Sequence, residues 1–307
     1  MIYWPVWGLF YGLMVALLGS CHSQAETHLE NNRVVLFGKN QYSEYRSGTL
    51  PIIITVPHGG YLKPNAMPDR QCTDCIYAMD ANTQELARSL DSLLKIRTGR
   101  SPHLIISKLH RIKLDPNRDV ADAADGNAAA AAAWSEYHQW IEDAKKSLLK
   151  QHSAGLLIDL HGHSHAIQRL ELGYLLESSD LRQTPEILNA QSNKKEFSLK
   201  NLFLKNKDKT TLDNLLRGAH SFGTLTHQQG YPAVPSQQIP APKIGEDYFS
   251  GGYTILRHGS SAGGRIDAIQ VECNRQNLRD TPANRHKFAA ALAQTIAQFY
   301  EHHYGAW

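Results

Sequence analysis

Three polar clusters in this sequence could supply ligands to a metal ion, and each directly follows a short apolar run. They are Val56-Pro-His58-Gly-Gly60, Asp159-Leu-His161-Gly-His163 and Val271-Glu272-Cys-Asn-Arg275. Neutral imidazoles and a carboxylate make a suitable three-ligand set for zinc, with a fourth position left open for water. The residue types therefore point to a zinc site, provided that the fold brings the clusters together.

Each cluster taken alone has an ordinary structural explanation. A histidine beside glycine is commonly a turn residue, Asp80 stands where a helix N-cap would be, and Glu272 could pair with Arg275 or Arg118. A fourth polar run, from Leu109 to Asp119, is too rich in turn residues to belong to a core. The functional interpretation gains weight because all four fall at strand ends or loops expected on one edge of a sheet.

The elements that must position these clusters alternate between strands and helices. Short β-branched runs predict strands, and apolar residues at helical spacing predict amphipathic helices. The Lys- and Asn-rich stretch 191–209 is expected to be a solvated loop, and the Pro/Gly-rich segment 231–252 is long enough for a functional lid. Strands are expected at 33–37, 51–56, 104–107, 156–160 and 266–271, and helices at 81–96, 127–150, 211–229 and from Thr281 onward.

This alternation predicts the fold class: an α/β protein with a mostly parallel sheet covered by helices on both faces. In such sheets, binding sites form beyond the carboxyl ends of the strands. The three clusters occupy that position.

Composition excludes several classes of protein. The chain has 307 residues, of which 42% are hydrophobic and 20% charged, so it is not disordered. Lys+Arg 32 against Asp+Glu 29 gives a net charge of +3, which offers no electrostatic case for a nucleic-acid partner. The 16 histidines could fill a metal site several times over, but their number does not say which of them matter.

The N-terminus is expected to direct export. Residues 1–21 contain no Asp, Glu, Lys or Arg, and Leu18-Gly19-Ser20-Cys21 resembles a bacterial lipobox. We therefore expect a lipoprotein signal peptide at 1–20, lipidation at Cys21, a tether at 21–32, one domain at 33–307 that carries the zinc site, and a lipid-anchored place in the cell envelope. A periplasmic or secreted protein, a retained anchor and an uncleaved cytosolic start are the alternatives.

Export changes what the remaining cysteines imply. Cys72 and Cys75 are close enough for a local disulfide in an oxidising compartment. Cys273 follows a strand-like run and is expected to be a small buried residue instead of a nucleophile.

Taken together, the motifs resemble the N-formylglutamate amidohydrolase family. They extend from about Ile52 to Arg279 and include, besides the three clusters, the Asp80 helix start, His110-Arg111, Asp115-Pro-Asn117-Arg118 and Gly251-Gly252-Tyr253-Thr254. The resemblance implies a three-layer α/β sandwich with a mixed, mostly parallel sheet, related to zinc carboxypeptidases and aspartoacylases. It also implies one zinc ion and cleavage of an amide bond beside a carboxylate.

The resemblance also implies roles for individual residues. His58 and His161 are the expected histidine ligands, with His163 as the alternative to His161. The relatives have a His-x-x-Glu pair where this chain has Tyr61, so Asp80 is the candidate for the remaining ligand. Glu272 is the expected general base, and the expected substrate-binding residues are Arg118, Asn117, Arg111 and Tyr253. His165 is expected to lie outside the set of ligands.

The leading hypothesis is a zinc-dependent amidohydrolase acting on an N-acyl amino acid, N-formyl derivatives included, or on a short peptide-like acid. A carboxypeptidase-like exopeptidase is the alternative within enzymes. A surface lipoprotein that binds zinc or a carboxylate without turnover is the alternative outside them.

Overall fold

The computed structural model describes residues 26–30 and 33–307, which fold around one mixed sheet. The described residues form nine strands in the order β1-β2-β3-β5-β4-β6-β9-β7-β8. The central strands β5, β4, β6 and β9 run parallel, and the pairings β1-β2, β2-β3, β3-β5 and β7-β9 are antiparallel. The strands are β1 (Glu26–Glu30), β2 (Arg33–Phe37), β3 (Ser43–Arg46), β4 (Ile52–Val56), β5 (His103–Ser107), β6 (Gly155–His163), β7 (Leu170–Gly173), β8 (Ala233–Val234) and β9 (Ile266–Asn274).

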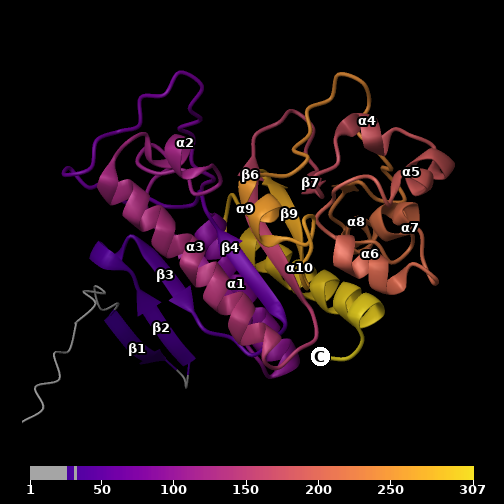
Figure 1. Ribbon diagram of the computed structural model, residues 1–307, viewed down its shortest axis with the longest axis horizontal. Coiled ribbons are helices and arrows are strands. Elements are labelled where there is room, and N and C mark those ends of the chain that lie inside the picture. Colours follow the sequence, from indigo (N-terminus) through magenta and orange to yellow (C-terminus); the bar gives the residue numbers. More distant parts are fainter. Residues whose placement is uncertain (1–25, 31–32) are drawn as a thin grey trace, which may run out of the picture.

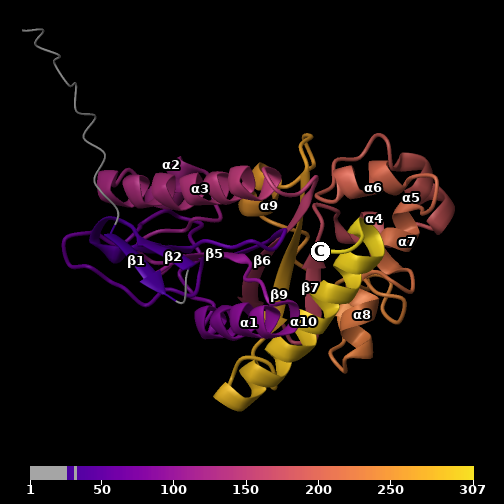
Figure 2. The ribbon, with the colours of Figure 1, turned by 90° about the horizontal axis from the view of Figure 1, so that it is seen from below.

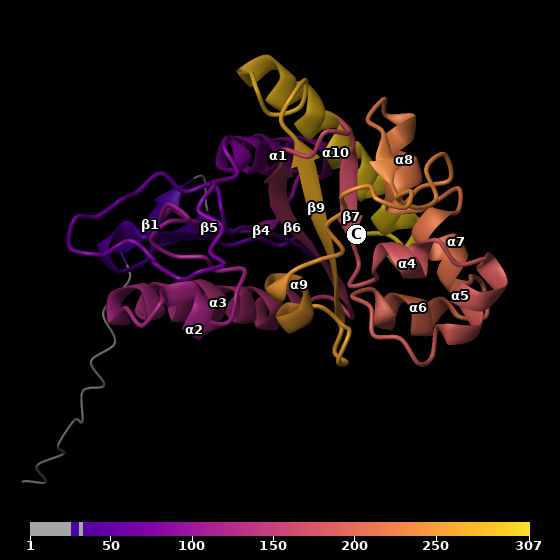
Figure 3. The same cartoon turned by 90° about the horizontal axis from the view of Figure 1, so that it is seen from above.

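Helices cover both faces of this sheet, which gives the three layers seen edge-on in Figures 2 and 3. On one face lie α3 (Ala128–Leu149) and α9 (Tyr253–His258), and on the other lie α1 (Thr83–Thr98) and α10 (Pro282–Tyr304). Beside β7 is a group of short helices: α4 (Ser178–Leu181), α5 (Pro185–Gln191), α6 (Lys200–Asn206), α7 (Leu212–Arg217) and α8 (Phe222–Gln228). The predicted mixed α/β sandwich is confirmed.

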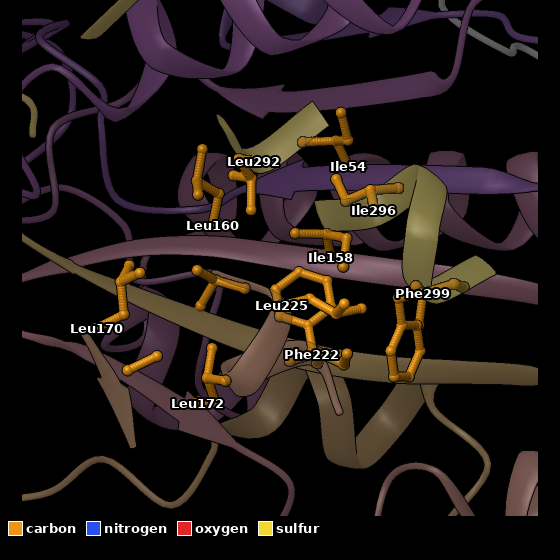
Figure 4. Close-up of a cluster of buried hydrophobic side chains, with 14 of the residues drawn as sticks. Ile54, Ile158, Leu160, Leu170, Leu172, Phe222, Leu225, Leu292, Ile296 and Phe299 are labelled. Atoms are coloured by element: carbon orange, nitrogen blue, oxygen red, sulfur yellow. The ribbon is translucent and has the colours of Figure 1, made fainter. Parts of the chain in front are cut away.

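The largest apolar core lies between the sheet and the layer of α1, α8 and α10. Ile54 and Ile158 from the central strands meet Leu292, Ile296 and Phe299 from α10, all fully buried (Figure 4). Continuous apolar runs in β4 and β6 are what strands covered on both faces require. The core therefore fixes the central strands, whose carboxyl ends carry the polar clusters.

Several predicted elements differ from the structure. The stretch 191–209 is not a solvated loop, because Phe197, Leu199 and Leu202 are buried in the main core and part of it forms α6. The single helix expected at 211–229 is two helices, separated where Gly218 is extended and Ser221 caps α8 by accepting from Thr224 N–H. Strands β1, β3, β7 and β8 were not predicted from the sequence.

The N-terminal predictions fall largely outside the described residues. The signal peptide at 1–20 and lipidation of Cys21 lie wholly outside them. Within the segment expected to be a tether, Glu26–Glu30 pairs with β2 as an antiparallel edge strand. Among residues 26–30 and 33–307, no helix combines the length and apolar character needed to cross a bilayer.

The sheet is tied to α1 by a buried carboxylate on β3. Glu44 accepts hydrogen bonds from both terminal nitrogens of Arg88, at 2.8 and 2.6 Å, and from Arg46 Nε at 2.6 Å. Burial alone would raise the pKa of Glu44, but Arg88 and Arg46 lower it to about 2. This stabilisation is present above the ordinary glutamate pKa and is lost as the pH falls towards 2.

We expect Glu44→Gln to destabilise the fold by up to about 3 kcal/mol at pH 7. The glutamine is uncharged and loses the ion pairs with Arg88 and Arg46 that lower the pKa of Glu44 in the folded protein. The stability difference from the unchanged protein should shrink as the pH falls below about 4.5. Urea denaturation at several pH values measures it. Glu30→Gln is the matched control, since Glu30 pairs with Arg46 through a carboxylate that is 54% exposed, and such pairs contribute about 0–1 kcal/mol. Equal losses in the two variants would contradict the prediction.

Candidate active-site cleft

The three polar clusters meet at the carboxyl ends of β4, β6 and β9. His58 follows β4 by two residues, and His161 and Glu272 are register partners on the neighbouring parallel strands β6 and β9. Side chains of register partners project from the same face of a sheet. The long loops that follow β4 and precede α9 extend beyond this edge of the sheet (Figure 1).

His58, Asp80 and His161 form a buried cluster of potential metal ligands. Asp80 Oδ2 lies 3.4 Å from His58 Nδ1 and 3.3 Å from His161 Nδ1. One ligand atom from each residue lies within 4.8 Å of the other two. All three side chains are at most 7% exposed. His163 is not part of this cluster, so the geometry favours His161 over it.

Asp80 is not the N-cap of α1, and its carboxylate is instead held by a backbone N–H group. The N-cap of α1 is Asn82, whereas the Asp80 carboxylate accepts a hydrogen bond from Gly162 N–H at 3.0 Å. Burial alone would raise the pKa of Asp80, but its interactions with His161 and His58 hold that pKa well below the usual value. The carboxylate is therefore ionised, which is the form that ligates metals.

Each histidine is oriented by a second carboxylate on its far nitrogen. His58 Nε2 lies 2.6 Å from Asp115 Oδ1, and His161 Nε2 lies 2.8 Å from Asp159 Oδ2. Thr55 in turn donates to Asp159 at 2.6 Å. These contacts leave both Nδ1 atoms facing Asp80, which is the arrangement of metal-ligating histidines.

Two buried polar atoms at this cluster make no hydrogen bond with any described residue: His58 Nδ1 and Glu272 Oε2. Buried polar groups are nearly always paired, so an unpaired ligand atom and an unpaired carboxylate oxygen on the same cleft fit a site for an ion and a water. The residues present therefore fit a three-ligand zinc site.

Glu272 lies beside the His58–Asp80–His161 cluster but is not one of its potential ligands. Its Oε1 lies 3.9 Å from His161 Nδ1 and accepts a hydrogen bond from Gln270 Nε2 at 2.9 Å. Burial raises the pKa of Glu272 to about 8; His161 opposes this, and the carboxylate of Asp80 adds to it. A carboxyl group that exchanges its proton near neutral pH suits general acid–base work.

The cluster opens into a cleft of about 570 Å³, a size that suits a small-molecule ligand. Four arginines line it: Arg111, Arg118, Arg275 and Arg279. Arg118 and Arg275 are exposed, and the guanidinium groups of both have no carboxylate partner among the described residues. They are therefore available to bind an anionic group of a ligand.

The other predicted substrate-binding residues have structural partners. Arg111 Nε donates to Asp115 Oδ2 at 2.9 Å, so it supports the carboxylate that orients His58. Asn117 Oδ1 accepts from Thr254 N–H at 2.8 Å. Tyr253 is not among the residues that line the cleft; its hydroxyl accepts a hydrogen bond from Arg257 at 2.8 Å and its ring packs near Trp134. The structure thus gives no support to substrate binding by Tyr253.

Two glycines of the motifs are explained by close approach. A Cβ on Gly162 would lie 2.3 Å from the guanidinium carbon of Arg279, and one on Gly252 would lie 2.3 Å from Asn117 Nδ2. Arg279 is 4% exposed and donates to the backbone carbonyls of Cys273, Ala81 and His163. It therefore holds the ends of β6 and β9 and the Asp80 loop together.

The cysteines behave as the sequence suggested. Cys72 and Cys75 are disulfide-bonded in the loop that carries Ile76 and Met79 into the cleft wall. Cys273 is fully buried, and burial raises its pKa above the usual thiol value. It is not a nucleophile.

Sequence reasoning missed the functional positions of Asp115, Asp159 and Gln270. Asp115 and Asp159 belong to motifs already noted, and Gln270 directly precedes the third cluster. Two of the three show a signal: Asp159 and Gln270 each stand two residues before a site residue on the same strand face. Asp115 has no such signal, because its partner His58 is 57 residues away.

No protein-family profile and no curated protein matches this sequence. Several solved structures are similar in fold. N-formylglutamate amidohydrolase from Ralstonia eutropha is 15% identical, with a TM-score of 0.48 over 83% of this chain and 94% of that one. Succinylglutamate desuccinylase from Chromobacterium violaceum is 11% identical (TM-score 0.38; 88% and 71%). An N-acetylmuramyl-L-alanine amidase from Mycobacterium smegmatis is 12% identical (TM-score 0.35; 81% and 95%).

Proposed function

We propose that this protein is a zinc-dependent hydrolase that cleaves the amide bond of an N-acyl amino acid, N-formyl derivatives included, or of a similar carboxylate-bearing substrate. The observation that carries the proposal is the buried His58–Asp80–His161 cluster with the unpaired oxygen of Glu272 beside it. Zinc held by those three residues would supply Lewis acidity, lowering the pKa of a water and polarising a carbonyl.

The protein's own residues supply the proton transfers. Glu272 Oε2, which has no other partner among the described residues, accepts a proton from the attacking water. The same carboxyl group then delivers that proton to the leaving nitrogen. The hydrogen bond from Gln270 to Oε1 leaves Oε2 as the reactive oxygen.

Arginine side chains in the cleft select an anionic substrate. Arg118 can bind a carboxylate through two parallel hydrogen bonds, which a lysine cannot reproduce. Its guanidinium is exposed to the cleft and carries no internal ion pair among the described residues. The carboxylate of the substrate would then fix the scissile amide relative to Glu272.

The test is hydrolysis of a panel of N-acyl amino acids, N-formyl derivatives included, by the purified full chain before and after chelation. We expect activity to disappear with the chelator and to return with zinc. Full activity in metal-free protein would refute the proposal. Release of C-terminal residues from longer peptides would identify an exopeptidase instead, and zinc binding without turnover of any substrate would identify a binding protein.

We expect Arg118→Ala to raise KM about 10–100-fold with a smaller change in kcat, because the lost bidentate contact to the carboxylate serves ground-state binding. Arg118→Lys should recover only part of the loss. Steady-state kinetics with an N-acyl amino acid measures the KM of both variants. The uncharged amide of the same compound, which lacks the carboxylate, should show little difference between the variants and the unchanged protein. Arg97→Ala, an exposed arginine at the end of α1, is the control; a KM unchanged by Arg118→Ala would remove Arg118 from the substrate site.

Asp115→Asn should weaken zinc binding about 10–100-fold, as is typical when a carboxylate that orients a ligating histidine is removed. Asp115 lies 2.6 Å from His58 Nε2 and also accepts from Arg111. Competition with a fluorescent zinc chelator measures the affinity. Asp119→Asn is the same substitution at the exposed N-cap of α2 (Val120–Ala124), where asparagine caps as well as aspartate, so it controls for the loss of a carboxylate outside the metal site. Identical affinities in the two variants would contradict this role.

The N-terminal segment completes the proposal. The uncharged residues 1–20 and the lipobox-like sequence ending at Cys21 support a bacterial lipoprotein anchored in the cell envelope. Metabolic labelling with a fatty acid, compared between the unchanged chain and Cys21→Ser, tests it.

A further inference from the structure

A second group of potential metal ligands lies beside the same cleft, which two of its three residues line, and plays no part in the proposed reaction. It consists of His163 at the end of β6, His165 in the following turn and Glu171 on β7. One ligand atom from each residue lies within 4.8 Å of the other two. None of the three belongs to the His58–Asp80–His161 cluster.

His163 is oriented as a metal-ligating histidine would be. Its Nε2 lies 2.8 Å from the carbonyl oxygen of Arg169. Because a carbonyl can only accept, Nε2 carries the proton and Nδ1 carries the lone pair that could bind a metal. That Nδ1 accepts a hydrogen bond from the backbone N–H of His165, at 3.2 Å, which a metal ion would replace. Anchoring one ring nitrogen on a carbonyl while the other points at the ion is the usual pattern for such ligands.

Glu171 is a fully buried carboxylate with no Lys or Arg partner among the described residues. Its Oε2 accepts from Phe249 N–H at 2.8 Å, and its Oε1 lies 2.9 Å from His165 Nδ1. A buried carboxylate whose only ion-pair partner is a histidine lacks a permanently charged counter-ion, which is costly. A metal ion at Oε1 would offset that cost.

His165 completes the set from the side of the cleft. Its ring stacks on Phe249 at 4.6 Å between centroids, with 19° between the planes, which fixes the ring orientation. Its side chain is 21% exposed, so the site is open towards the cleft. This open side would leave a coordination position for water or for an oxygen of a bound ligand.

We propose that His163, His165 and Glu171 form a second site for a divalent transition metal, with zinc the ion that best suits two imidazoles and one carboxylate. The site repeats the design of the His58–Asp80–His161 cluster: two histidines and one buried carboxylate, with the far atoms of His163 and Glu171 anchored by hydrogen bonds. It is independent of the proposed function, because it shares no ligand with that cluster.

Zinc stoichiometry of the full chain tests the second site. After loading with zinc and removal of the excess, elemental analysis should find two zinc ions per chain in the unchanged protein. We expect one in His165→Ala, one in Glu171→Gln and one in Asp80→Ala. Titration against a competing chelator should show that His165→Ala weakens the zinc affinity of one of the two sites by at least about 10–100-fold. A loss of that size is typical when only a hydrogen bond to a ligating histidine is removed, and His165→Ala removes a ligand itself.

The control is His302→Ala. His302 on α10 and His220 between α7 and α8 stack at 3.8 Å outside the cleft and could bind zinc adventitiously. Two ions in the unchanged protein but one in His302→Ala, or a stoichiometry unaffected by both His165→Ala and Glu171→Gln, would overturn the proposal. Then His165 and Glu171 would form only a hydrogen-bonded pair. Circular dichroism of each variant verifies the fold. Failure of the first site is distinguishable, because it would leave Asp80→Ala with unchanged zinc content.

Discussion

Replacing Glu272 with glutamine should lower kcat at least about 10³-fold while zinc binding to the His58–Asp80–His161 cluster remains within a fewfold of normal. An amide cannot accept the proton of the attacking water, and general acid–base groups contribute about 10²–10⁴-fold to such reactions. Glu272 is proposed to act twice, first as base and then as acid, so its loss affects both steps.

The geometry makes Glu272→Gln an informative change. The two side chains have the same shape, and the glutamine oxygen can still accept the hydrogen bond that Gln270 donates to Oε1. Burial favours the neutral form at this position, as the raised pKa of Glu272 indicates, so a neutral amide should not unfold the site. Single-turnover kinetics, zinc analysis and thermal unfolding of the same preparation separate chemistry from binding and stability.

Glu85→Gln is the matched control for Glu272→Gln. Glu85 lies exposed in the first turn of α1, outside the cleft, so its kcat should be unchanged. A Glu272→Gln variant that keeps a tenth or more of the normal kcat would exclude Glu272 as the general base. A variant that loses zinc together with activity would instead assign Glu272 to the metal ligands.

Asp80→Ala should lose one zinc ion per chain and with it all measurable amidase activity. Asp80 Oδ2 lies within 3.4 Å of the ligand atoms of both histidines, and removal of this carboxylate leaves two neutral ligands for a doubly charged ion. Tight structural and catalytic zinc sites in proteins use at least three protein ligands. The effect should therefore exceed that of Asp115→Asn, which alters only the orientation of His58.

Thermal unfolding gives a readout of Asp80→Ala that does not depend on turnover. Zinc at about 1,000 times its dissociation constant stabilises a folded protein by about 4 kcal/mol per site, so zinc should raise the Tm of the unchanged protein by more than that of Asp80→Ala. Asp74→Ala, an exposed aspartate in the neighbouring loop, is the control. Equal zinc-induced shifts in all three proteins would show that Asp80 is not a ligand.

The gathering of the site residues was predictable because of how parallel sheets are built. Apolar runs identified β4, β6 and β9, and the carboxyl ends of neighbouring parallel strands lie at one edge. His58, His161 and Glu272 each follow or end such a run, so their proximity follows from the strands alone. The choice of Asp80 came from the family resemblance, and the structure places its carboxylate between the two histidines.

Other features depended on contacts that local patterns do not carry. Strand β7 has four residues and lies between β9 and β8, an order set by packing across the sheet. The stretch around Phe197 looked solvated because its lysines outnumber its apolar residues, yet a few apolar side chains are enough to bury it against the core. Propensity gives way to tertiary packing in such short elements.

The sequence by itself determined the layered α/β fold, the edge of the sheet that carries the chemistry and the residue types present there. Periodicity and strand ends are local properties, and these three features follow from them. Only the tertiary structure decided that Asp115 orients His58, that Tyr253 lies outside the cleft, and that His163 joins His165 and Glu171 instead of Asp80. Those partnerships depend on side-chain directions and on distances of a few ångströms between segments far apart in the chain, which are fixed only when the core is packed.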